Sequence, residues 1–375
     1  MTGLTQAEHS FLRYSSLNHW RGIAALMVVA FHTSWATSWA GSPTPAFALS
    51  RSICSVGWSG VHLFFVISGY CIAANIHYRT IHQQPASSFI KDRFLRIYPP
   101  YWAALGVSIC LGFLFSPFSH AGDEVKLFPT PQVFLTNLAL IEPYCGTPSA
   151  LIVSWTLVYE FGFYLLVAVG LAIFNRFGLG RFWVGSGVCL AFASFLKLPQ
   201  PAFLVLNYWP EFLCGALIYL ARLERLRNHH RCRWLYLLLI PVLAVMGLFV
   251  SHSERAGHFL IAGPFALLLY FLAPFDEQIV HARLLRWLGF IGAFSYSLYL
   301  IHATLLVRMS NFARRFVAPE SAILGWIFLG MALGSVVGGY VFYQLCEVPL
   351  EVWRRHLRHT GSSRLDLATI SGRGK

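Results

Sequence analysis

Five ionisable side chains stand inside long apolar stretches of the sequence: His32, His62, Glu160, Glu211 and His302. If those stretches cross a membrane, each such residue costs about 2.5–3.5 kcal/mol on insertion scales, and residues of this kind mark substrate sites and proton relays. Imidazole and carboxylate groups are also common general bases. The residue types therefore point to acid–base chemistry at membrane depth.

Arg21 and His32 are eleven residues apart. Eleven residues make about three helical turns, so both side chains project from one face, about 16 Å apart along the axis. A cation at the membrane surface with an imidazole deeper on the same face predicts a path for an elongated, anionic substrate. The alternative is an interfacial arginine that extends towards water beside an unrelated histidine.

A second pair of cations, Arg93 and Arg96, lies in the segment 89–97, whose apolar residues gather on one side of a helical wheel. This pattern is typical of an interfacial helix, on which residues three apart are neighbours. Two guanidinium forks together suit a phosphate group. Anchoring on the cytoplasmic surface explains the same pair equally well.

Glu160 lies near the start of the apolar segment 154–174, where a carboxylate can pair with an imidazole and raise its basicity. Distances from the expected helix ends place all five ionisable residues in one layer of the membrane. We therefore expect Glu160 within hydrogen-bond reach of His32, with Glu211 and His302 as the next candidates. Ser295, Tyr299 and His302 form a polar stripe at spacings of four and three residues.

The elements that would position these residues are membrane-spanning helices. The chain is 57% hydrophobic and only 11% charged, with a mean hydropathy of +0.59, far from the composition of a soluble domain. A span needs about 20 apolar residues. We expect an all-α integral membrane bundle of ten such helices, at 20–40, 56–75, 98–118, 154–174, 181–198, 203–222, 234–251, 258–275, 287–307 and 322–346.

The formal net charge of +13 indicates membrane topology rather than nucleic-acid binding. With both termini cytoplasmic, the inside segments hold 21 of the 28 lysines and arginines, as the positive-inside rule requires. The outside loop with Arg308, Arg314 and Arg315 is the exception. We expect one transmembrane domain over 1–350, followed by a short basic cytoplasmic tail over 351–375.

Eight cysteines are scattered without paired spacing, so the sequence predicts no metal site and no thiol redox motif.

Seven motifs in order resemble the acyltransferase family 3 membrane proteins. They are Arg21 with His32, the stretch 60–70, the arginine-rich 93–99, Ser154 to Glu160, Glu211 to Gly215, Phe294 to His302, and Glu347 to Pro349. The resemblance implies transfer of an acetyl or short acyl group from acyl-CoA to a hydroxyl of a glycan or lipid-linked sugar, in the bacterial cytoplasmic (inner) membrane. Acetyl-CoA would be a co-substrate, and no bound cofactor is implied.

In the family, the residues that match Arg21 and His32 are essential, and those that match Arg93, Arg96 and Glu347 are thought to contribute. The chain resembles the stand-alone form of the family. Several relatives have an arginine shortly before the match to Glu211. Here the positions are Asn207, Tyr208 and Trp209, which puts acceptor binding in that region in doubt.

These residues suggest a mechanism for such chemistry. Arg21, Arg93 and Arg96 would hold the phosphates of CoA, and a pantetheine arm of roughly 15–20 Å would carry the thioester to His32. His32 would be the general base, or would itself take the acyl group. Glu160 or Glu211 would fix its tautomer. The possible acceptor-binding or supporting residues are His62, Glu211, Tyr299, His302 and Glu347.

A secondary transporter is the alternative, because it also uses histidines and glutamates inside the membrane. Such transporters usually contain internal repeats with corresponding broken helices. The prolines at 210, 241 and 264 interrupt helices but do not fall in corresponding halves. The identity of the acceptor, the acyl chain length and the side of the membrane on which the acceptor reacts stay open.

Overall fold

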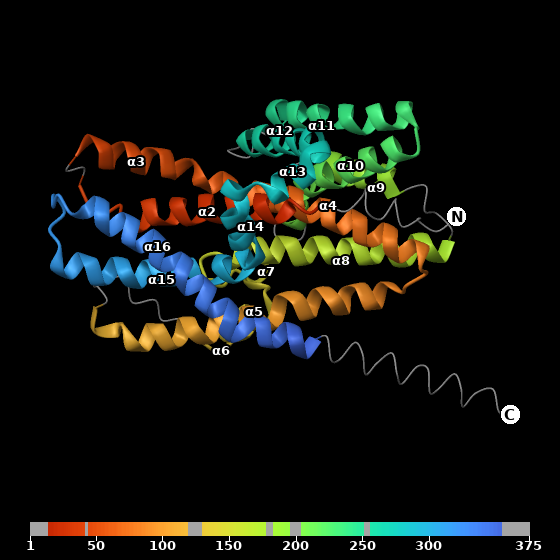
Figure 1. Cartoon of the computed structure of the whole chain (residues 1–375). Helices are drawn as coiled ribbons and strands as arrows, with labels where there is room; N and C mark the ends of the chain where they lie inside the picture. The colour runs from red at the N-terminus through yellow and green to blue at the C-terminus, as the bar shows by residue number, and fades with distance from the viewer. Residues whose placement is uncertain are drawn as a thin grey trace.

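The computed structural model describes residues 14–41, 44–118, 130–177, 183–195, 204–250 and 256–354, and within these ranges the chain is helical without a strand. The long helices run roughly side by side in one bundle (Figure 1). They are α2 (Leu17–Ala36), α4 (Gly60–Ile81), α5 (Ala86–Leu114), α8 (Ser154–Phe177), α10 (Trp209–Leu226), α11 (His230–Val250), α12 (Ala256–Leu272), α15 (Ser295–Phe316) and α16 (Leu324–Phe342).

Shorter pieces connect them. The short α-helices are α3 (Pro45–Ser55), α6 (Pro131–Ala139), α7 (Glu142–Cys145), α9 (Trp183–Phe195), α13 (Asp276–His281) and α14 (Arg286–Ala293). The 3₁₀ turns are η1 (Val56–Ser59), η2 (Ser116–Phe118), η4 (Leu204–Tyr208), η5 (Ala273–Phe275) and η6 (Arg283–Leu285), and a π-helical turn, η7, covers Tyr343–Glu347.

Among the described residues, seven helices are long and apolar enough to cross a membrane, or eight if the bent pair α14–α15 is one span. The chain is therefore a multi-pass membrane protein, but the prediction of ten spans is not confirmed. Helix α9, in the predicted span 181–198, has only 13 residues. The tail beyond residue 354 lies outside the described residues, and the cytoplasmic placement of the termini stays a prediction.

Helix α2 is not among those seven spans, although it carries Arg21 and His32. It packs against α4, α14 and α15 at the centre of the molecule (Figure 1). Because protein surrounds it, α2 can carry polar side chains that a lipid-facing helix would not tolerate.

Two predicted helix boundaries are wrong. The predicted interfacial helix at 89–97 and the span from 98 form one helix, α5, which continues through Pro99 and Pro100. The predicted span 287–307 is broken at Phe294, where the axes of the two parts differ by 72°. Prolines inside membrane helices and breaks in buried helices are tolerated where neighbouring groups satisfy the backbone, which sequence periodicity does not reveal.

Glycines set the close helix contacts that bring the polar residues together. A Cβ atom at Gly22 would overlap the Leu288 carbonyl oxygen, so α2 and α14 pack backbone to backbone. Between α4 and α10, a Cβ at Gly69 would overlap the Phe212 carbonyl oxygen, and one at Gly215 would overlap that of Val66. Small residues of this kind let membrane helices approach closely.

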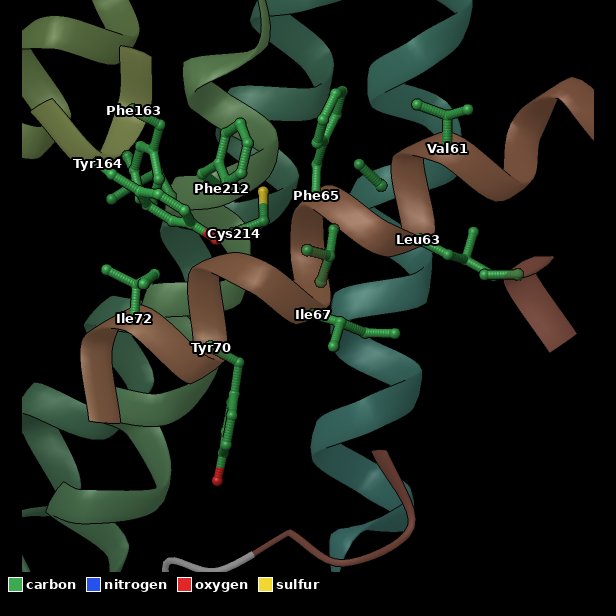
Figure 2. Packing of buried hydrophobic residues seen from close by; sticks show 14 of the residues in the cluster. Val61, Leu63, Phe65, Ile67, Tyr70, Ile72, Phe163, Tyr164, Phe212 and Cys214 are labelled. Carbon is green, nitrogen blue, oxygen red and sulfur yellow. The ribbon is translucent and has the colours of Figure 1, made fainter. Parts of the chain in front are cut away.

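The packed core around α4 fixes the orientation of that helix. The rings of Phe163 and Phe212 stack at 4.1 Å between centroids, and Phe65 lies 4.8 Å from Phe212. Figure 2 shows these three rings between α4, α8 and α10. Because Val66 and Ile67 are also almost fully buried, α4 cannot rotate freely, and its polar residues are held towards fixed neighbours.

Candidate active site

An inner cavity of about 260 Å³ lies between α2, α4, α5, α8 and α15. Its charged lining residues are Arg21, Arg93, Arg96, Glu160 and Glu347. These come from three helices, α2, α5 and α8, and from the π-helical turn η7, which lie far apart in the sequence. The predicted donor-binding arginines are therefore gathered in one cavity.

The three arginines differ in how the protein holds them. Arg21 donates a hydrogen bond to the Cys71 sulphur at 3.3 Å. Arg93 stacks over the Tyr164 ring, with its Cζ atom 5.4 Å from the centroid. Arg96 makes no hydrogen bond or ion pair within the described part of the chain. A guanidinium group that faces a cavity without a partner is suited to bind an anion.

Glu160 belongs to this inner cavity and does not contact His32. Its carboxylate accepts hydrogen bonds from the Ser68 hydroxyl, at 2.9 Å, and from the Tyr164 hydroxyl. Within the described residues no hydrogen bond joins Glu160 to His32, so the predicted pair is not formed in this structure. The reason lies in the helix rotation, since α8 presents Glu160 towards Ser68 of α4 and not towards α2.

His32 pairs with His302 instead. The Nε2 atom of His302 lies 3.2 Å from the Nδ1 atom of His32, and the ring centroids are 4.8 Å apart. His302 is fully buried, whereas His32 is half-buried. The α2–α14 contact positions the start of α15, and α15 then brings His302 against α2.

The hydrogen bonds fix the tautomers of the two neutral rings. The Nδ1 atom of His302 lies 3.0 Å from the Leu298 oxygen and 2.8 Å from the Tyr299 oxygen, so it must carry the proton and donate. Its Nε2 atom is then an acceptor. The Nδ1–H group of His32 therefore donates, both to His302 and to the Val28 oxygen at 3.0 Å. This leaves the lone pair of His32 on Nε2, where a general base needs it.

His62 and Glu211 form a second buried pair. The Nδ1 atom of His62 lies 2.9 and 3.0 Å from the two carboxylate oxygens of Glu211. The exposed fractions are 2% for His62 and 0% for Glu211. The five ionisable residues thus fall into two pairs and Glu160, instead of the single mutual cluster that one common layer suggested.

An outer cavity of about 290 Å³ adjoins the inner one. Its lining includes three imidazoles, those of His32, His62 and His258. Two tryptophans and two tyrosines also line it: Trp58, Trp155, Tyr208 and Tyr299. Val61 and Tyr299 line both cavities, so they stand at the partition. A cationic chamber and an aromatic chamber therefore meet at Val61 and Tyr299, and His32 lines the aromatic one.

The remaining predicted residues lie at the edges of these cavities. The Tyr299 hydroxyl is 2.7 Å from the Thr156 hydroxyl and donates to the Val153 oxygen at 3.2 Å, which holds the partition in place. Glu347 accepts a hydrogen bond from Ser297 at 2.5 Å. Its position in a π-helical turn, a feature common at functional sites, directs it into the inner cavity.

Sequence reasoning missed several lining residues. Ser68 bonds Glu160 in the inner cavity. His258 and Trp58 line the outer cavity, although aromatic residues in apolar helices usually face the core or the lipid. The available signal was weak: His258 is an ionisable residue near the start of the apolar segment 258–275.

Comparisons with known proteins identify the family of this chain. The model of an acyltransferase domain, that of acyltransferase family 3, matches residues 14–344. The exopolysaccharide production protein ExoZ of Rhizobium meliloti (strain 1021) is 28% identical over 335 residues, which is 85% of this chain and 95% of that protein. The acyltransferase MdmB of Streptomyces mycarofaciens is 26% identical over 185 residues, 48% of this chain and 45% of that protein. No solved structure gives a significant match. Because the family model covers nearly the whole chain, the protein belongs to acyltransferase family 3.

Proposed function

We propose that the chain transfers an acetyl or other short acyl group from acyl-CoA, bound in the inner cavity, to a hydroxyl group at His32 in the outer cavity. The acceptor is a glycan or a lipid-linked sugar, as the name of the ExoZ relative suggests. The observation that carries the proposal is the free Nε2 edge of His32, placed where a cation-lined cavity meets an aromatic one.

The donor site suits a molecule with a charged end and a long neutral arm. Three guanidinium groups in the inner cavity face only two carboxylates, so the cavity favours an anion. Arg96 supplies a free fork for phosphate oxygens. With the phosphates at these arginines, the thioester of a pantetheine arm about 15–20 Å long extends past Val61 and Tyr299 to His32.

The acyl transfer step balances with His32 as the single proton carrier. Nε2 of His32 takes the proton of the acceptor hydroxyl while that oxygen forms a bond to the thioester carbonyl carbon. The tetrahedral intermediate then collapses, and the carbon–sulphur bond breaks. The proton on Nε2 passes to the departing sulphur, which gives CoA as the thiol and returns His32 to its neutral form.

His302 has the positioning role that the sequence assigned to a carboxylate. It holds the His32 ring by accepting from Nδ1–H, and its own Nδ1 is anchored to two carbonyl oxygens of α15. The Val28 oxygen accepts from the same His32 proton and supports the imidazolium that forms during the reaction. In a catalytic triad a carboxylate orients the histidine. Here the His302 ring would have that orienting role without a carboxylate.

Purified protein in nanodiscs tests the proposal through hydrolysis of acetyl-CoA and isotope exchange between acetyl-CoA and CoA. We expect hydrolysis in the absence of other acceptors, because water can take the acceptor position. We also expect the purified protein to transfer labelled acetyl to cell-envelope glycans that were isolated from a strain lacking the protein. A transporter would bind or move its solute and leave acetyl-CoA intact, and that outcome would refute acyl transfer.

A further inference from the structure

The His62–Glu211 pair is a buried imidazole–carboxylate pair, and the transfer step above does not use it. The reciprocal glycine contacts of α4 with α10 at Gly69 and Gly215 hold the two helices close enough for the pair to form. The bond from His62 Nδ1 reaches both oxygens of Glu211 within 3.0 Å.

Their mutual hydrogen bond alone does not explain why His62 and Glu211 are buried at this position. Glu211 is fully buried, and within the described residues its ion pairs include no arginine or lysine, only His62. Burying an ionised carboxylate such as that of Glu211 costs several kcal/mol, and apolar side chains of similar volume often stabilise such a position as well or better. A pair of this kind that also borders a cavity is therefore a candidate binding element.

The ring of His62 is held in one orientation. Its neighbours are Trp58, edge-on at 5.2 Å between centroids, and His258, tilted at 4.4 Å. With Nδ1–H donated to Glu211, the lone pair of the neutral ring is on Nε2. His62 and His32 both line the outer cavity, so two imidazoles with fixed Nδ1 atoms share one chamber of about 290 Å³.

We propose that the outer cavity is the acceptor site and that His62, fixed by Glu211, positions the acceptor by accepting a hydrogen bond from a second hydroxyl. That hydroxyl neighbours the one whose proton His32 removes. The acceptor is then a vicinal diol, such as two adjacent hydroxyls of a sugar ring. The aromatic faces of Trp58, Trp155 and Tyr208, which line the same cavity, suit the apolar face of such a ring. This inference rests on the proposed function.

The same residues also invite a metal-ion interpretation. One potential ligand atom from each of His62, Glu211 and His258 lies within 4.8 Å of the others. Ligand atoms of a tetrahedral zinc site are closer, about 3.3 Å apart for bonds of about 2.0–2.1 Å. The metal site is therefore an outcome for the experiment to exclude.

The test compares two reactions of the purified full chain. Acetyl-CoA hydrolysis without added acceptor depends on the donor site and His32. Acetyl transfer to de-acetylated envelope glycan of the source organism depends on acceptor positioning as well. For His62→Phe, which keeps a flat ring without nitrogen, we expect the apparent KM for glycan to rise at least about 10-fold, as for loss of a hydrogen bond in a closed site, and hydrolysis to fall by a much smaller factor than transfer at a fixed glycan concentration. Glu211→Gln should show a smaller rise.

The control variant is Glu142→Gln, since Glu142 is also fully buried but bonds Ser149 and Ser154 and lines neither cavity. It should leave both reactions unchanged. Glycan whose hydroxyls have been partly O-methylated should react poorly with the unmodified protein, and His62→Phe should discriminate less between native and methylated glycan.

Three results overturn the proposal. If His62→Phe lost hydrolysis and transfer equally, His62 would have a structural role only. If transfer were unchanged in this variant, His62 would have no role in binding the acceptor. Stoichiometric zinc by elemental analysis of the unmodified protein, lost in His62→Phe, would establish a metal site in place of a hydroxyl contact. If the unmodified protein neither hydrolyses acetyl-CoA nor transfers acetyl, the proposed function itself fails, a result distinct from these three.

Discussion

The inner and outer cavities share a wall at Val61 and Tyr299, but different kinds of side chain line them: charged residues in the inner cavity, and imidazoles and aromatic rings in the outer one. The inner cavity places three arginines and two glutamates around its space, and one of the arginines, Arg96, has no hydrogen bond or ion pair in the described part of the chain. The outer cavity is lined by imidazoles, aromatic rings and aliphatic side chains, and the Glu211 carboxylate lies behind one of these imidazoles, bonded to His62.

This difference separates binding from chemistry. Fixed cations bind the phosphates of a donor equally in the ground state and the transition state, so they lower KM without raising kcat. An imidazole that takes up the proton of the reacting hydroxyl, as proposed for His32, acts in the transition state, so its effect falls on kcat. Substitutions of the inner-cavity arginines and of His32 should therefore separate into these two kinetic classes.

The largest expected effect comes from His32 in the outer cavity. His32→Ala should reduce kcat by about 10²–10⁴-fold, the usual span for the loss of a general base. Affinity for CoA, measured by titration calorimetry, should change little, because His32 does not line the inner cavity. If this variant lost CoA binding, the separation of donor binding from proton transfer between the two cavities would be wrong.

His302 should have the next largest effect, through the orientation of His32. His302→Phe leaves the Val28 oxygen as the one acceptor described for Nδ1–H of His32 and removes the ring that orients it, so kcat should fall by about 10²-fold. His302→Gln, whose amide oxygen can accept that proton, should recover part of the loss. Combined with His32→Ala, either change should add little, since groups that act as a unit are not additive. Independent, multiplying losses would contradict the pairing.

The inner cavity should show the opposite pattern. Replacing Arg93 and Arg96 with alanine should raise the apparent KM for acyl-CoA at least about 10-fold, because charged hydrogen bonds are worth about 1.5–3 kcal/mol each. The kcat should fall less than the affinity does. Lysine substitutions should recover only part of the affinity, because a single ammonium does not replace a fork.

Arg283 and Arg286 offer a matched control, since they are also basic but line neither cavity. Their alanine variants should retain the KM of the unmodified protein. If the Arg93 and Arg96 variants behave in the same way as this control, those arginines serve only as membrane anchors.

The smallest of these effects should be that of Glu160, although the sequence placed it beside the base. Glu160→Gln keeps hydrogen bonds to Ser68 and Tyr164 possible and should change kcat less than about 10-fold, as for one weakened hydrogen bond. Steady-state kinetics measures this change in kcat. A loss as large as that of His32→Ala would support the Glu160–His32 pair that was predicted from the sequence and is not formed in this structure.

Much of the fold followed from composition and periodicity. An all-helical bundle was predictable, because a bilayer allows only helices or closed barrels to span it and the apolar runs have helix length. The number of spans was not, since α2 is protected by its neighbours and α9 is short. The continuity of α5 through Pro99 and Pro100 and the break at Phe294 also depended on tertiary contacts.

By itself, the sequence determined which residues were too costly to be incidental. His32, His62, Glu211 and His302 are unfavourable in an apolar setting whatever their neighbours, and their selection required no structure. The spacing of Arg21 and His32 likewise needed only the helical repeat, and both line the cavities that meet at Tyr299.

Only the tertiary structure decided the pairing of these residues. Depth along a helix gives one coordinate, while a hydrogen bond also needs rotation and lateral distance. Close glycine contacts set those two: Gly22 places α2 against α14, and Gly69 with Gly215 places α4 against α10. His32 therefore meets His302 and His62 meets Glu211, while Glu160 turns to Ser68 in the other cavity.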